Sequence, residues 1–391
     1  MKTFTYILAL MLALPATISA QGLQHYLNSV EANCPALKSS ASLCEAVRAE
    51  ARAGNVPEDP SIEFSPFFAD GTDGMATSEM VVSMGFDFPT LYASRAKYGK
   101  ISGNAAELQY MIARRDILLS AAGMWMDRVM LEQNRQLLQD RLQYADSMTA
   151  VCRTRLERGD ASAIDLNKAR LDAMTARVEL NGTEASLRQI KAKMAALNNG
   201  EEVKFTADGY PALFNIAPDD SLAEKMLGFE LEVQAAETQV ALTQQSLSVE
   251  RQGWIPKFEA GYRRNTDEDK VLNGFIIGAS FPVFSNINKS KAAKARLQAS
   301  EYQNEAARLE AKARIESGLD ELSRLEQSIK CYDRELMDET LTMLRKAVNE
   351  GYMGIGDYYI EADKIYQYLQ SLNQLENTYH KTVLEVFKNY L

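Results

Sequence analysis

The chain has 391 residues, of which 46% are hydrophobic and 25% are charged, and its formal net charge is −10. No basic stripe balances this acidic charge, which argues against a nucleic-acid partner. Only two histidines and four widely spaced cysteines are present, so the ligand clusters of a zinc or copper site are not supported. We therefore expect no metal and no cofactor.

Residues 1–20 predict a secretory signal peptide. A positive charge at Lys2 precedes an apolar run over 4–14, and a small-residue cleavage site precedes Gln21. A retained N-terminal anchor is the less favoured alternative. Because residue 21 is Gln rather than Cys, we do not expect lipid attachment there. No later stretch reaches the 18 or so apolar residues that a transmembrane helix needs.

The next elements are strands. An alternating pattern over about 60–89 and again over about 255–284 predicts two β-hairpins, hence four strands. The polar, Gly/Asp-rich stretches 69–77 and 265–274 are expected to be loops. The apolar positions of each pattern fall on one face. In the first hairpin they are Met80, Val82, Met84, Phe86 and Phe88, and in the second Phe275, Ile277, Ala279 and Phe281.

This alternation has two explanations. One is a four-stranded sheet in an ordinary α+β domain. The other is a membrane barrel, which has bulky apolar side chains on the outside and aromatic residues gathered at its ends. Four strands cannot close a barrel, and an open sheet edge cannot lie in lipid. A membrane location therefore requires several copies of the chain. The aromatic residues near the ends of the strands are Phe88, Tyr92, Trp254, Phe281 and Phe284.

Long helices follow each hairpin, over about 92–198 and 287–390. The first has no proline over 92–157, a span of about 100 Å. The return helix has the 3–4 spacing of a coiled coil. Its predicted seam is Leu166, Ala169, Ala173, Ala176, Leu180, Leu187, Ile190, Met194 and Leu197. The positions 192 residues later are Tyr358, Glu361, Ile365, Tyr368, Leu372, Tyr379, Thr382, Val386 and Asn389. Six of these nine are apolar, so we expect an imperfect second seam.

The helical turns repeat as well. Gly159 and Gly351 are 192 residues apart, and so are Asp165 and Asp357. The strand ends repeat at offsets of 193 (Phe88 and Phe281) and 196 (Pro60 and Pro256). We infer two copies of one unit, residues 21–198 and 221–391, joined by an irregular segment at 199–220. Ser162 and Asp165 resemble a capping box, so each Asp is first interpreted as a helix-start residue.

The four cysteines, Cys34, Cys44, Cys152 and Cys331, form no CxxC pair. We expect small buried thiols, with a single disulfide or a metal contact as the alternative.

Taken in this order, the motifs resemble those of TolC-type outer-membrane efflux proteins. The resemblance rests on the two-fold repeat and on "NCPAL" (33–37) and "ARAGNVPEDPSIEFSPFF" (51–68). It also rests on "FPTL" and "FPVF" after the second and fourth strands and on the tip "RLERGDASAIDL". The entry into the first strand is similar to the branch that works with heavy-metal pumps. The lipidated cysteine common in that branch is absent here.

The resemblance implies a mainly α fold with a small membrane β portion. Three chains would close a 12-stranded barrel in the outer membrane of a Gram-negative-type bacterium, and their helices would form a periplasmic tunnel. The implied partners are a periplasmic adaptor, an inner-membrane pump and outer-membrane lipid. The tips would contact the adaptor and gate the tunnel through Arg155, Leu156, Arg158, Gly159, Asp165, Gly351 and Asp357. Arg155 and Arg158 have no basic counterparts in the second tip, so unequal roles are expected.

The function implied is a passive conduit without enzymatic activity. A conduit for type I protein secretion is the alternative. A periplasmic coiled-coil adaptor is less favoured, because it would carry one helical hairpin rather than two. A secreted enzyme is disfavoured, since no nucleophile elbow, metal cluster or phosphate loop is present. The cargo and the partner pump stay open.

Overall fold

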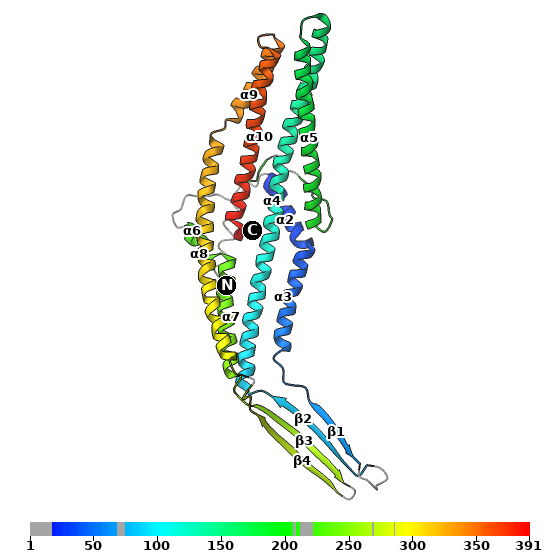
Figure 1. Ribbon diagram of the computed structural model, residues 1–391, viewed down its shortest axis with the longest axis vertical. Coiled ribbons are helices and arrows are strands. Elements are labelled where there is room, and N and C mark those ends of the chain that lie inside the picture. Colours follow the sequence, from blue (N-terminus) through cyan, green and yellow to red (C-terminus); the bar gives the residue numbers. More distant parts are fainter. Residues whose placement is uncertain (1–17, 69–74, 206–208, 212–221, 268–269, 285) are drawn as a thin grey trace. The chain divides into compact units, whose positions relative to one another are not determined.

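The computed structural model describes residues 18–68, 75–205, 209–211, 222–267, 270–284 and 286–391 (Figure 1). Almost all of the predicted signal peptide, and parts of the stretches 69–77, 199–220 and 265–274, lie outside these residues. The predicted fold class, mainly helical with a small sheet, is confirmed. The helices are α2 (Ile18–Asn33), α3 (Pro35–Ala53), α4 (Pro89–Arg158), α5 (Ala163–Leu197), α6 (Leu222–Gly228), α7 (Leu231–Gln252), α8 (Lys289–Lys330), α9 (Arg334–Asn349) and α10 (Ile355–Val386). The strands are β1 (Ser61–Phe67), β2 (Thr77–Phe86), β3 (Lys257–Asp267) and β4 (Val271–Ser280).

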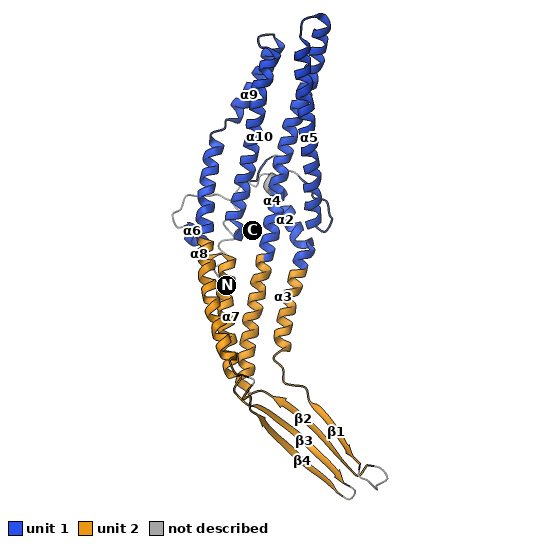
Figure 2. Cartoon of the chain, viewed as in Figure 1, with its two compact units in different colours: residues 1–38, 113–226, 313–391 blue, residues 39–112, 227–312 orange. Residues whose placement is uncertain are grey.

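The chain divides into two compact units (Figure 2). Unit 1 comprises residues 1–38, 113–226 and 313–391, and unit 2 comprises residues 39–112 and 227–312. Unit 2 holds the whole sheet with α7 and the neighbouring parts of α3, α4 and α8. Unit 1 holds α5, α9 and α10 with the remainder of α4 and α8. Each sequence repeat therefore contributes to both units.

The sheet has the order β1-β2-β3-β4, with every neighbouring pair antiparallel. Val82 lies opposite both Ile62 and Tyr262, and Tyr262 lies opposite Phe275. Since side chains opposite each other share a face, the apolar positions of all four strands form one surface. Phe275 and Ile277 on this surface are 89% and 91% exposed. The predicted alternation is confirmed.

The second hairpin is longer than its sequence predicted. β3 continues to Asp267 and β4 begins at Val271, so most of the stretch 265–274 is strand and the predicted loop was wrong. Polar and Gly residues there suggested a loop. They pair across the hairpin nonetheless, with Thr266 opposite Val271 and Arg264 opposite Asn273, because backbone pairing does not need a buried side chain on each residue.

The two long helices differ in continuity. α4 runs unbroken for 70 residues from Pro89, a residue favoured at the first helical position because its missing N–H has no helical partner there. In the second repeat the equivalent helix stops at Lys330 and restarts as α9. Asp333 caps this restart by accepting a hydrogen bond from the Leu336 amide at 3.0 Å. This interruption was not predicted from the sequence.

The first seam is confirmed, and the second is partly wrong. Of the nine positions predicted in α5, seven are buried: Leu166, Ala169, Ala173, Ala176, Leu180, Leu187 and Met194. In α10, Glu361 and Tyr368 are exposed, whereas Ala362 and Leu369 are buried. From Leu166 the steps to the next buried residues are +3 and +4, whereas from the equivalent Tyr358 they are +4 and +3. A fixed offset of 192 therefore selects the wrong neighbours.

The prediction of four buried thiols was wrong at Cys331. Cys34, Cys44 and Cys152 are buried, Cys331 is exposed, and all four are free. Cys331 lies where α8 ends, in the interruption that the sequence analysis missed. No helix in the described part of the chain is long and apolar enough to cross a membrane.

Candidate functional site

Both helical hairpins of unit 1 end in the same backbone turn. Gly159 and Gly351 each have φ of +81°. In each turn the amide after the glycine donates to the carbonyl four residues before the glycine, at 2.8 Å. These are the bonds of a Schellman motif, whose left-handed residue is usually Gly because any Cβ is strained there. The 192-residue repeat of glycine thus has a backbone cause.

The helices restart differently after the two turns. The Ser162 hydroxyl accepts from the Asp165 amide at 3.1 Å, and the Asp165 carboxylate accepts from the Ser162 amide at 3.2 Å. This is a complete capping box. At the second tip Gly354 takes the place of Ser162 and offers no side-chain cap, while Asp357 is exposed. Helix capping therefore accounts for Asp165, but the same bonds are not made at Asp357.

The remaining predicted tip residues do not converge. Leu156 packs against a buried cluster of unit 1, whereas Arg155 is partly exposed and Arg158 is exposed. No ion pair among the described residues joins any predicted tip charge to the other hairpin. The hairpins do approach each other near the tips. A Cβ added to Gly356 at the start of α10 would lie 2.5 Å from the Lys168 ammonium of α5.

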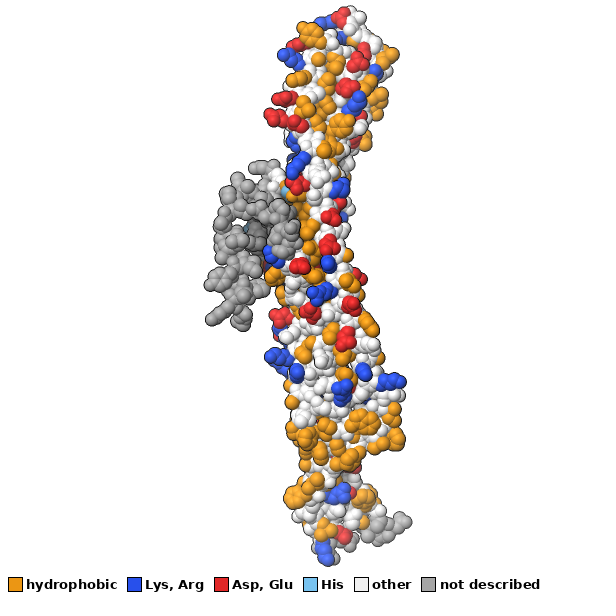
Figure 3. All heavy atoms as spheres, turned by 90° about the vertical axis from the view of Figure 1, so that its left-hand side faces the viewer, with side chains coloured by type: hydrophobic (Ala, Val, Ile, Leu, Met, Phe, Trp, Pro, Cys, Tyr) orange, Lys and Arg blue, Asp and Glu red, His pale blue; other side chains and the backbone are white. Residues whose placement is uncertain are grey.

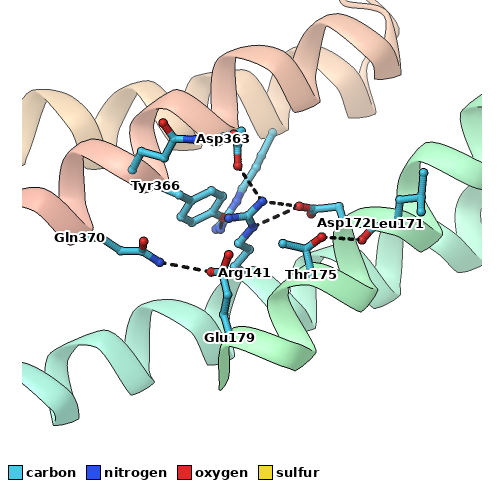
Figure 4. Close-up of polar contacts among 10 residues, drawn as sticks. Arg141, Leu171, Asp172, Thr175, Glu179, Asp363, Tyr366 and Gln370 are labelled. Atoms are coloured by element: carbon cyan, nitrogen blue, oxygen red, sulfur yellow. Dashed lines mark hydrogen bonds and ion pairs between the residues drawn. The ribbon is translucent and has the colours of Figure 1, made fainter. Parts of the chain in front are cut away.

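A buried arginine joins the hairpins further along (Figure 4). The Arg141 side chain, in α4, is 6% exposed. Its guanidinium donates to the Asp172 carboxylate of α5 at 3.0 and 2.6 Å and to the Asp363 carboxylate of α10 at 3.0 Å. It also lies over the Tyr366 ring, 4.7 Å from the centroid. One cation thus connects three helices of unit 1.

Burial governs the charges of this cluster. Desolvation raises the pKa of Asp172, although Arg141 draws it down. The two carboxylates raise the pKa of Arg141 despite its burial. Nearby, burial raises the pKa of Tyr144 to about 12, so its hydroxyl stays protonated at neutral pH. The cluster of Arg141, Asp172 and Asp363 is stable only while every charge keeps its partner, because an unpaired buried charge is costly.

The Arg141 contact belongs to a column of polar contacts between α4 and α10. Its members recur every seven residues along α4, so they lie on one side of that helix. The contacts are Asp127 to Asn377 at 2.8 Å, Asn134 to Asn373 at 2.7 Å, and Arg141 to Asp363 at 3.0 Å. Asn373 and Asn377 are 1% and 3% exposed. The two hairpins are therefore joined through hydrogen bonds as well as apolar packing.

Sequence reasoning missed Arg141 and its partners. A signal was present, because Arg141 stands at 3–4 spacing between buried Leu138 and Ala145, where a coiled-coil seam calls for an apolar residue. A charge at such a position indicates a buried ion pair. The partner helix cannot be found from this spacing, since Asp363 lies 222 residues away.

Residues 26–200 match the sequence profile of the family described as "Outer membrane efflux protein". No curated protein matches the chain by sequence. Several solved structures share the fold. One is the channel-forming protein CusC, with 15% identity over 94% of this chain and 92% of that chain, at a TM-score of 0.79. The CmeC outer membrane channel of Campylobacter jejuni has 13% identity over 94% and 85%, at 0.78. The MtrE channel of Neisseria gonorrhoeae, in its open state, has 14% identity over 94% and 88%, at 0.79.

The sequence match covers the first repeat, and the structural match covers nearly the whole chain. The predicted outer-membrane location is that of the proteins which share this fold. The predicted resemblance is therefore confirmed: the chain has the fold of the TolC-type outer-membrane efflux proteins, and its first repeat matches that family.

Proposed function

We propose that the protein is the outer-membrane channel of an efflux system, built as a homotrimer. The observation that carries this proposal is the exposed apolar surface of the sheet. Phe275 and Ile277 are about nine-tenths exposed on it, at 89% and 91%. Lipid is the partner that suits such a surface. Three copies would supply twelve strands and close the sheet, which removes the open edges that lipid does not tolerate.

The long helices would continue the barrel as a periplasmic tunnel. The two repeats, 21–198 and 221–391, would each supply one strand hairpin and one helical hairpin to the ring, with the segment 199–220 around its middle. The protein would act as a passive conduit between an inner-membrane pump and the exterior, without catalysis. A conduit for type I protein secretion is the alternative, which the same architecture would serve.

The tips would meet a periplasmic adaptor. Beside the tip residues Arg155, Leu156, Arg158, Gly159, Asp165, Gly351 and Asp357, α5 carries a row of exposed apolar side chains. Ile164, Leu171 and Val178 recur every seven residues and are 67%, 61% and 71% exposed. Exposed apolar residues at heptad spacing suit a further helix packed alongside. An adaptor hairpin or a neighbouring copy would supply that helix.

The polar column between the hairpins would serve the gate. When two helices separate, hydrogen-bonding groups can exchange their partners for water, whereas apolar side chains lose their burial. We expect the Arg141 cluster to hold the hairpins together in the closed tunnel. Release of Asp363 from Arg141 would then allow α10 to move.

The membrane proposal is tested by two adjacent isoleucines. Ile277 lies on the apolar surface, while Ile276 lies on the opposite face, across from Gly261. Ile277→Lys should prevent accumulation of trimers in outer membranes, because a lysine on the lipid face costs about 2–4 kcal/mol near the bilayer centre. Ile276→Lys should be tolerated. The readout is the native mass of the detergent-extracted protein. Equal amounts of trimer in the two variants would refute the lipid-facing assignment of Ile277.

The cargo is tested separately. Survival of a deletion strain is measured across cadmium, zinc, cobalt and copper salts, and across bile salts, dyes and antibiotics. Sensitivity to metals alone, with raised cellular metal, would assign the channel to metal efflux. Sensitivity to amphiphiles alone would assign it to drug and detergent efflux. Loss of a secreted polypeptide without either sensitivity would favour the secretion alternative.

A further inference from the structure

Each repeat carries two lysines at the same place near the start of its long helix. Lys97 and Lys100 lie in α4, and Lys291 and Lys294 lie 194 residues later in α8. All four side chains are exposed, and none of them makes an ion pair or a hydrogen bond with another described residue. These four residues, called the paired lysines below, therefore present free ammonium groups in both repeats.

Neither neighbouring acids nor the helices themselves compensate this positive charge. No Asp or Glu occurs over 88–106 or over 270–300, although the whole chain has a net charge of −10. The first turn of α8 holds Lys289 and Lys291 and no acidic residue. Cations there are opposed by the helix dipole, which is positive at the helix start. The folded chain thus gives the paired lysines no stabilising partner, which leaves them available to an external anion.

The paired lysines lie on the side of their helices that continues the apolar surface of the sheet. On the other side, Arg95 of α4 and Lys289 of α8 line one hollow with Asp87 and Lys257. Lys257 belongs to the polar face of the sheet, because the next residue, Phe258, belongs to the apolar face. In each helix the paired lysines follow Arg95 or Lys289 by two and five residues, which turns them by about 200° and 140° round the helix axis. They therefore point away from the polar hollow.

Exposed aromatic side chains lie between the sheet and the paired lysines. Phe88, Phe281 and Phe284 are 42%, 67% and 84% exposed, and Trp254 is 51% exposed. Figure 3 shows Lys and Arg side chains next to a band of hydrophobic side chains where the helices of unit 2 meet its strands. Aromatic residues gather at the interfaces of a membrane, where the lipid head groups lie. The paired lysines fall within the first four turns of α4 and α8, and lysine side chains extend toward such a surface.

We propose that the paired lysines bind the phosphate groups of anionic phospholipids in the periplasmic leaflet of the outer membrane. A phospholipid supplies both partners that this part of the chain lacks, an anion for the ammonium groups and acyl chains for the aromatic side chains. The attraction acts over a Debye length of about 8 Å at physiological ionic strength. Four lysines per chain make twelve in the proposed trimer. The inference rests on the channel proposed above and names the lipid at its periplasmic end.

Tryptophan fluorescence tests the inference where the lipid would lie. Trp254 is half exposed beside the aromatic side chains, whereas the chain's other tryptophan, Trp125, is buried at 0% exposure. The full-length protein is reconstituted in vesicles of phosphatidylcholine with a minor fraction of phosphatidylglycerol, and one of the two lipids carries bromine on its acyl chains. Per lipid, brominated phosphatidylglycerol should quench the fluorescence several-fold more than brominated phosphatidylcholine. This excess should shrink at high salt, which screens the attraction.

Replacing all four paired lysines by Gln should remove the excess quenching, and replacing them by Arg should keep it. Replacing only the pair in α4 or only the pair in α8 by Gln should each remove about half. The matched control removes the same charge from four exposed cations of unit 1, and its excess quenching should be unchanged. It carries Arg153→Gln, Arg170→Gln, Arg188→Gln and Lys193→Gln.

Native mass of each variant separates the two levels of the proposal. An unmodified protein that does not insert into the vesicles, or that stays monomeric, would refute the channel itself. An inserted trimer that both lipids quench equally, or whose preference survives the loss of all four lysines, would overturn the lipid inference alone. Sedimentation with purified cell-wall sacculi that depends on the same lysines, without any lipid preference, would assign them to peptidoglycan instead.

Discussion

The two helical hairpins of unit 1 share a turn but differ in how they are built around it. Both turn at a glycine with φ of +81°. The first hairpin has an unbroken α4 and a capping box at the start of α5, while the second has an interruption after Lys330 and no side-chain cap at Gly354. The glycine is present where backbone geometry requires it, whereas the caps, which several residue types supply, have diverged.

This difference suggests unequal roles for the hairpins. The first hairpin, with a continuous helix and a fully capped return, is expected to be the more rigid. The second joins a short helix, α9, to its neighbours at both ends through turns. Hinges are a few residues that absorb changes in backbone angles, and both ends of α9 offer such residues. In the proposed channel, we therefore expect α9 and α10 to move against α4 and α5 on opening.

The strongest way to break the connection between the hairpins is Arg141→Met. Removing one partner of a buried ion pair costs about 3–5 kcal/mol, because the other charge stays buried without compensation. We expect a lower thermal midpoint and an increased leak of small antibiotics. The loss should shrink as the pH falls, since burial already raises the pKa of Asp172 and a protonated carboxyl needs no cation.

The matched control is Arg177→Met. Arg177 pairs with Asp146 between the same helices and at the same sequence separation as Arg141 and Asp172, but both side chains are more than half exposed, at 59% and 52%. Exposed ion pairs contribute little. Antibiotic leak and thermal midpoint should therefore stay near those of the unmodified protein. Equal effects of the two variants would show that the Arg141 cluster has no special role.

A second difference between the hairpins depends on pH. The described residues between the two repeats are 199–205 and 209–211. They contact the first hairpin through Phe205, which packs on Trp125 with ring centroids 4.7 Å apart. They contact the second through Tyr210, which stacks on His380 at 4.3 Å. Burial lowers the pKa of His380 to about 4 from its ordinary value of 6.5. Only the second contact therefore titrates in the acid range.

Because the folded-state pKa of His380 is depressed, protonation favours the unfolded or separated state. Stability is complete above pH 6.5 and is lost as the pH falls toward 4. The loss should be no more than about 3.5 kcal/mol, at about 1.4 kcal/mol for each of about 2.5 pKa units. In His380→Phe the thermal midpoint should fall less over this interval, while the exposed His25→Phe should behave as the unmodified protein. A midpoint that falls equally in all three proteins would refute the assignment.

The tips show how far the sequence predicts a site. The repeat predicted both turns, because a glycine with positive φ leaves a clear sequence signal, and the spacing of Ser162 and Asp165 indicated the cap. The Arg141 cluster was missed, since its partners come from helices distant in sequence. For a related reason, the sequence pattern placed Glu361 in the second seam, where the structure buries Ala362 instead. Which side of a helix is buried depends on the helices packed against it.

The two turns should respond alike to replacement of their glycines. Gly159→Ala and Gly351→Ala each place a Cβ in the left-handed region, at a cost of about 1–2 kcal/mol. Nothing lies within 4 Å of the Cβ position at either glycine, so backbone strain is the only expected effect. Hydrogen exchange at each tip should accelerate by a similar factor. A much larger effect at one tip would show that this glycine also serves a contact with another molecule.

The smallest expected effect concerns the N-terminal caps of α5 and α10. Ser162→Ala removes one partner of the capping box and should lower the free energy of unfolding by about 1 kcal/mol. Gly354→Ser adds a capping hydroxyl and should raise it by only a few tenths of a kcal/mol, because Gly is itself a tolerable cap. If the uncapped start of α10 serves its movement, Gly354→Ser should also slow hydrogen exchange of the first amides of α10 and lower antibiotic leak. Hydrogen exchange in α5 should not change. Slower exchange with unchanged leak would mean that the missing cap is a neutral divergence. The greater mobility of the second hairpin would then have to arise at the interruption between α8 and α9.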